Sequence, residues 1–159
     1  MRRIVLALAA CIASAFVDSA LSQSSTRQDE VQQKGSVVMP FDLARTQHFF
    51  DDTPTGGVET VTANDKRDAK QIELIRSHLR SEAQRFARGD FSDPAAIHGQ
   101  EMPGLASLAA SGARLQVKYK QLANGASITF ASRDKSTVAA VHEWFAAQRM
   151  DHGAHAHLH

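Results

Sequence analysis

The chain contains two regions in which apolar and polar residues alternate. In the first, residues 44–50 and 58–63 are short extended runs separated by a segment rich in Pro, Gly and Asp. In the second, residues 115–120 and 127–131 alternate on either side of an Ala-Asn-Gly turn at 123–125. Period-two alternation around turn-forming residues predicts a β-hairpin in each region.

A stretch with helical spacing follows each predicted hairpin. Residues 68–88 place apolar side chains three and four positions apart, and Gly89 then acts as a stop signal. Residues 134–150 show the same spacing around Val141. The segment 90–112 between the two units is divided by prolines, so we expect short helical pieces joined by turns.

These elements predict a single α+β domain over residues 39–150. The order is ββα, a helical insert, then ββα, and the simplest architecture is a four-stranded antiparallel sheet with two main helices on one face. Residues 23–38 are polar without periodicity, which predicts a flexible linker. Residues 151–159 form a histidine-rich C-terminal tail.

The N-terminal segment, residues 1–22, has the pattern of a cleaved signal peptide. Arg2 and Arg3 are followed by an apolar run from Ile4 to Val17, and small residues precede a cleavage point before Gln23. The run is shorter than the roughly 20 residues of a membrane-spanning helix, so we expect no stable membrane insertion after cleavage. The expected location is periplasmic or secreted.

Charge and cysteine content narrow the possible partners of the mature chain. Removing residues 1–22 takes two of the 18 basic and one of the 17 acidic side chains, which leaves 16 of each. This balance gives no basic surface excess for nucleic acid. The one cysteine, Cys11, lies inside the signal segment, so the mature chain has neither disulfides nor thiolate ligands.

The main chemical signal is histidine, of which the chain has eight. Without cysteine, imidazole is the best ligand available for copper or zinc. The tail carries His152, His155, His157 and His159 within its last eight residues, a composition typical of metal binding. A solvated tail without function is the alternative interpretation.

Histidines within the domain suggest an ordered site as well. His98, His142 and His152 each lie near the end of a predicted element, where loops converge, and three histidines are an ordinary ligand set for zinc. Met102 stands four residues after His98 and offers a thioether for copper. His78 lies at the boundary of the apolar face of its helix and is a further candidate; for any one histidine, a half-buried structural role is the alternative.

Motifs for nucleophilic catalysis are absent. The sequence has no Gly-x-Ser-x-Gly, no catalytic thiol, no His-Glu-x-x-His and no phosphate-binding glycine loop. The residues therefore do not favour an enzyme. A small hydrolase using a metal-bound water is a third hypothesis, behind metal binding and the binding of a protein or peptide.

Several motifs together resemble a family of small exported bacterial proteins often labelled aspartate carbamoyltransferase. They are Met39-Pro-Phe-Asp-Leu, Ile97-His-Gly-x-x-Met-Pro-Gly-Leu, and Val141-His-Glu-Trp-Phe-Ala-Ala-Gln with Asp151-His-Gly. The label does not fit the residues, because that enzyme has a longer catalytic chain with two α/β domains. Its Ser-Thr-Arg-Thr loop and His-Pro-x-Gln segment are missing here. The resemblance implies one exported domain and no particular activity.

The sequence thus predicts an exported protein that binds copper or zinc through histidines of the domain and of the tail. The alternative is a non-catalytic envelope domain that binds a protein or peptide on its sheet face.

Overall fold

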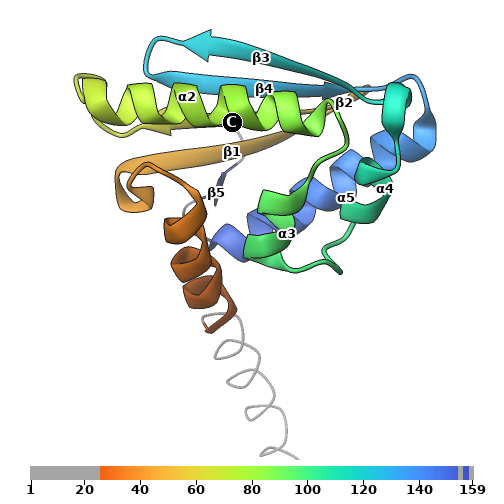
Figure 1. The fold of residues 1–159 in the computed structure, drawn as a ribbon, viewed down its shortest axis with the longest axis horizontal. Coiled ribbons are helices and arrows are strands. Elements are labelled where there is room, and N and C mark those ends of the chain that lie inside the picture. The colour runs from red at the N-terminus through yellow and green to blue at the C-terminus, as the bar shows by residue number, and fades with distance from the viewer. Residues whose placement is uncertain (1–25, 154–155, 158–159) are drawn as a thin grey trace, which may run out of the picture.

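The structure, a computed structural model, describes residues 26–153 and 156–157. Its centre is a sheet with the strand order β3-β4-β2-β1-β5 (Figure 1). The four long strands are β1 (Thr46–Thr53), β2 (Gly56–Ala63), β3 (Gln116–Leu122) and β4 (Gly125–Ala131). These four strands are antiparallel to one another, which confirms the predicted α+β fold with a four-stranded antiparallel sheet.

Two long helices cover one face of this sheet. Helix α2 (Ala69–Phe86) packs on β4, β3 and β2, and α5 (Lys135–His152) packs on β2 and β1. The helical insert contributes α3 (Ser92–His98) and α4 (Leu105–Ala109), which lie beside α5 (Figure 1). Two short 3-10 turns, η1 (Leu43–Arg45) and η2 (Gly112–Arg114), precede β1 and β3.

Local sequence explains why the helices begin where they do. The side chain of Asp68 accepts a hydrogen bond from the backbone N–H of Gln71, and that of Asp134 accepts one from Thr137. Each aspartate satisfies a backbone donor that the first helical turn leaves unpaired. Gly89, with φ at +78°, follows α2 and allows the chain to turn away.

An aromatic cluster holds the two helices to the sheet. Trp144 on α5 contacts Phe130 on β4 and Phe86 on α2 edge to face, with ring centroids 5.3 and 5.9 Å apart. Trp144, Phe130 and Phe145 are all buried. Burial of aromatic side chains of this size contributes a large share of the packing energy of a small domain.

The predicted flexible linker is wrong for most of its length, because residues 26–38 form a helix. Val31 on this helix is 1% exposed, and Val38 lines a pocket of the domain. Arg27 anchors the helix through an ion pair with Asp151. One buried valine and one long-range ion pair offset the polar composition, which on its own indicated a solvated segment.

The predicted boundary between domain and tail also differs from the structure. Helix α5 continues to His152, and β5 (Ala156–His157) lies parallel to β1 with Ala156 opposite His48. Part of the tail therefore belongs to the fold. The predicted signal peptide, Cys11, His155 and His159 lie outside the described residues.

In the described part of the chain, no helix has the length and apolarity needed to cross a membrane.

Candidate functional site

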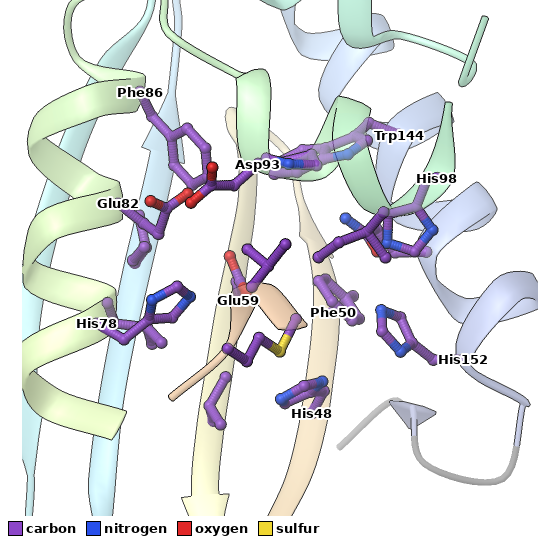
Figure 2. A pocket seen from close by; sticks show the side chains of 18 of the residues that line it. His48, Phe50, Glu59, His78, Glu82, Phe86, Asp93, His98, Trp144 and His152 are labelled. Carbon is purple, nitrogen blue, oxygen red and sulfur yellow. The ribbon is translucent and has the colours of Figure 1, made fainter. Parts of the chain in front are cut away.

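A pocket of about 40 Å³ lies under the helices, between α2, α3, α5 and the inner face of the sheet. Its walls are largely apolar, but seven ionisable side chains also line it (Figure 2): His48, His78, His98, His152, Glu59, Glu82 and Asp93. Ionisable groups gathered around an apolar pocket are typical of a binding or catalytic site.

Three histidines meet at one end of this pocket. His48 comes from β1, His98 from the end of α3 and His152 from the end of α5. The ring centroid of His152 lies 5.1 Å from that of His98 and 5.4 Å from that of His48. Figure 2 shows the three rings along one side of the pocket. The structure thus brings together His98 and His152, which the sequence predicts as ligands, and adds His48, which the sequence does not predict.

His98 is held by a carboxylate and an arginine. Its Nδ1 lies 2.8 Å from Asp151 Oδ2, and Arg27 donates to both oxygens of the same carboxylate at 2.6 and 3.1 Å. Arg27 also donates to the backbone oxygen of His98 at 2.7 Å. The helix of residues 26–38 thus ties together the ends of α3 and α5.

Electrostatics keep this His98 imidazole neutral. Burial lowers the pKa of His98, and the hydrogen bond to Asp151 opposes that effect only in part. Burial would raise the pKa of Asp151, but hydrogen bonds from Arg27 and His98 outweigh it and hold that pKa below its usual value. An ionised Asp151 can only accept, so Nδ1 of His98 carries the proton and Nε2 keeps its lone pair.

The other end of the pocket is acidic. Glu59 projects from β2, and Glu82 from α2 lies near Asp93 from the start of α3 (Figure 2). Arg85 pairs with Glu82 at 3.0 Å and with Asp93. Burial, and secondarily Asp93, raises the pKa of Glu82 to about 7. Burial and repulsion from Glu82 raise the pKa of Glu59 to about 8, so Glu59 holds a proton at neutral pH.

His142, the third member of the predicted histidine site, lies elsewhere. Its Nε2 is 3.0 Å from the backbone oxygen of Thr53 and 2.9 Å from that of Gly56. Since both partners are acceptors, Nε2 carries a proton and donates to the turn of the first hairpin. Ten residues of α5 separate His142 from His152, which is about 15 Å along the helix. The predicted set of His98, His142 and His152 is therefore wrong in one member, whose role is structural.

Two other predicted ligands also lie apart from the three-histidine cluster. Met102 is buried in the hydrophobic core and does not line the pocket. His78 lines the pocket from α2, where its ring meets the edge of Phe41 at 5.6 Å. Burial lowers the pKa of His78. Of the tail histidines beyond His152, only the backbone of His157 is described, paired with Phe49.

Within residues 26–153 and 156–157, no group of three or more His, Cys, Asp or Glu side chains is arranged to hold a metal ion. The three imidazoles are close, but their rings meet edge to face. A metal at this end of the pocket needs a ring rotation or a further donor.

Sequence reasoning missed Glu59 and His48, although a signal for both was present. Residues 59, 61 and 63 share one face of β2 by alternation, and Val61 and Ala63 are buried. The same rule puts His48 on the face of Phe50. Asp151 belongs to the predicted tail, and only its contact with His98 identifies its role.

No protein-family model matches this chain, and neither the curated proteins nor the solved structures include a significant match to it. The resemblance noted from the sequence motifs therefore stays a prediction.

Proposed function

We propose that this protein is exported and binds copper or zinc at the end of the pocket formed by His48, His98 and His152. The observation that carries the proposal is the meeting of three imidazoles from three separate elements, with His98 oriented by Asp151. A histidine whose Nδ1–H is bound by a carboxylate, with Nε2 left as a ligand, is the usual arrangement around protein-bound zinc.

Orientation by Asp151 favours metal binding for two reasons. It fixes the tautomer of His98 that presents Nε2, and it raises the basicity of the ring. Arg27 holds the carboxylate in place with two hydrogen bonds, so His98 needs little reorganisation when a metal binds. His152 comes from the last turn of α5, and its ring lies between those of His48 and His98 and stacks on Phe50.

The described part of the tail beyond α5 lies beside the strand that carries His48. Strand β5 lies beside β1 with Ala156 opposite His48, and neighbouring strands are about 4.8 Å apart. The backbone of β5 thus passes next to His48. We propose that the tail histidines add to the metal binding of the domain. Imidazole ligands favour Cu(II) or Zn(II) over harder ions.

The test is a calorimetric titration of the mature chain, produced without an affinity tag, with Zn(II) and with Cu(II). We expect His98→Ala and His152→Ala each to weaken binding at least tenfold. Asp151→Asn should weaken it by about 10- to 100-fold, the usual effect of losing the partner of a metal-bound histidine. His142→Ala is the matched control, because it removes a histidine of α5 that lies outside the cluster; its affinity should equal that of the wild type.

A second variant separates the contribution of the tail histidines to metal binding from that of the domain. Replacing His155, His157 and His159 by Asn should weaken binding without abolishing it. If this variant loses all binding while His98→Ala binds like the wild type, the tail alone binds the metal and the proposal for the domain is wrong. The interaction of the domain with a protein partner would then become the leading hypothesis.

The proposal that the protein is exported is tested by measuring the mass of the mature chain. The intact mass of the protein recovered from its native host should correspond to a chain that begins at or within a few residues of Gln23. A mass that retains residues 1–22, or that includes a lipid on Cys11, would contradict the proposal.

A further inference from the structure

The acidic end of the pocket contains a carboxyl group in an unusual position. Glu59 stands on β2 directly between Phe50 of β1 and Ile128 of β4, in the row of side chains that faces the helices. Both neighbours are buried. A carboxyl on the inner face of a central strand is costly unless something compensates for it, because charged groups lose their hydration there.

Few neighbouring groups offset the free-energy cost of burying the Glu59 carboxyl. Arg85 is the nearby cation, and it is already shared among Glu82, Asp90 and Asp93. Glu59 makes no hydrogen bond or ion pair with any other described residue. Protein surrounds Glu59, yet part of its side chain stays accessible, and it lines the cavity. Figure 2 shows Glu59 in the middle of the pocket.

Two further polar groups line the same cavity without partners. Nε1 of Trp144 and Oε1 of Gln148 are buried and have no hydrogen-bond partner among the described residues. The two residues are 1% and 5% exposed. Buried polar atoms of native proteins are nearly always paired, so atoms of this kind around a cavity indicate what a ligand should offer. Oε1 of Gln148 calls for an N–H donor, the Nε1–H of Trp144 calls for an acceptor, and Glu59 calls for a positive charge once it has given up its proton.

We propose that this pocket binds a small organic ammonium ion, with Glu59 releasing its proton to solvent and becoming the counter-ion, and with Gln148 as a second acceptor. The aromatic rings of Phe50, Phe86 and Trp144 line the cavity and provide apolar and π surfaces for the alkyl-ammonium group. A cavity of about 40 Å³ holds about three water molecules, which limits the ligand to a few non-hydrogen atoms.

Two members of the three-histidine cluster lie between this cavity and a second, outer one. His48 and His152 line both the inner pocket and an outer cleft of about 180 Å³ between the helix of residues 26–38 and the domain. The ammonium site lies beyond them, toward α2. It does not depend on metal binding, and it is tested with metal removed by a chelator.

The experiment uses the mature chain at pH 7 with three probes of similar size, namely ethylammonium, ethanol and acetate, followed by ligand-observed NMR. We expect ethylammonium to bind in the millimolar range and the neutral and anionic probes not to bind. Glu59→Gln should weaken ethylammonium binding at least tenfold, and Gln148→Met should weaken it by a smaller factor. Glu73→Gln, at an exposed position of α2, is the control for loss of a carboxylate and should bind like the wild type.

A second measurement reports on Glu59 directly. The ¹³Cδ resonance of Glu59 should move from the protonated to the ionised position as ethylammonium is added, because the cation stabilises the carboxylate. Binding of ethanol as strong as that of ethylammonium, unchanged binding in Glu59→Gln, or no binding of any probe would each overturn the proposal. Ethylammonium binding that persists in His98→Ala would show that the two sites are separate, whatever the outcome of the metal titration.

Discussion

Replacing Glu59 by Gln should stabilise the protein at neutral pH. Burial and the nearby Glu82 raise the pKa of Glu59 from 4.5 to about 8. Between these values the folded protein keeps the proton while the unfolded chain releases it. The folded state therefore binds more protons than the unfolded state, and stability falls as the pH rises from about 4.5 to about 8. Glutamine has nearly the same shape as glutamate and does not titrate. The stability of the variant therefore does not fall across this pH range.

The size of the effect follows from the width of the pH interval. Each pH unit within the window lowers the unfolding free energy by about 1.4 kcal/mol. From pH 4.5 to pH 7 the upper limit is therefore roughly 3 kcal/mol. Glu59 keeps part of its surface accessible, which weakens the effect of burial. We expect Glu59→Gln to be about 1.5 to 3 kcal/mol more stable than the wild type at pH 7.

Urea denaturation at pH 4, 5, 6, 7 and 8 measures this difference. The two proteins should have similar stability at pH 4, and the advantage of Glu59→Gln should grow with each pH step up to 8. Glu73→Gln serves as the control at an exposed site on α2. A difference that does not change with pH, or a destabilised Glu59→Gln, would refute the conclusion that Glu59 is protonated in the folded protein.

Three further predictions concern the fold. His142→Ala should lower the unfolding free energy by about 1 to 2 kcal/mol in urea denaturation, because it removes the donor to the backbone oxygens of the first hairpin turn. Gly104→Ala should cost at least about 2 kcal/mol in the same assay, since φ is +76° and a Cβ would overlap the Ala140 carbonyl oxygen; Gly99→Ala, also at positive φ but with open space around it, should cost less. Val31→Asp should release the helix of residues 26–38, which limited proteolysis would detect as new cleavage there; cleavage like that of the wild type would contradict the docking of this helix.

The histidine content of the sequence predicts the kind of side chain in the candidate site, but it predicts little of how these side chains are arranged. The abundance of histidine is visible in the sequence, and His98 and His152 do meet in the fold. The sequence predicts His142 as a ligand on equal grounds, yet His142 donates to the turn of the first hairpin. Nothing local distinguishes these histidines, because the partner of each comes from a distant part of the chain. Alternation along β2 would have indicated that Glu59 faces inward, although not that it lacks a partner.

The sequence by itself determined the hairpins, the two long helices and the α+β class. These depend on interactions within a few residues, such as the cap made by Asp134 and the period-two burial of β-strands. Tertiary structure alone decided which side chains form the site. Asp151 and His98 are 53 positions apart, and Arg27 and Asp151 are 124 apart. Such contacts arise only when α3 and the helix of residues 26–38 dock at the end of α5. The same docking turned a polar segment, which local composition predicted to be a linker, into the element that orients His98.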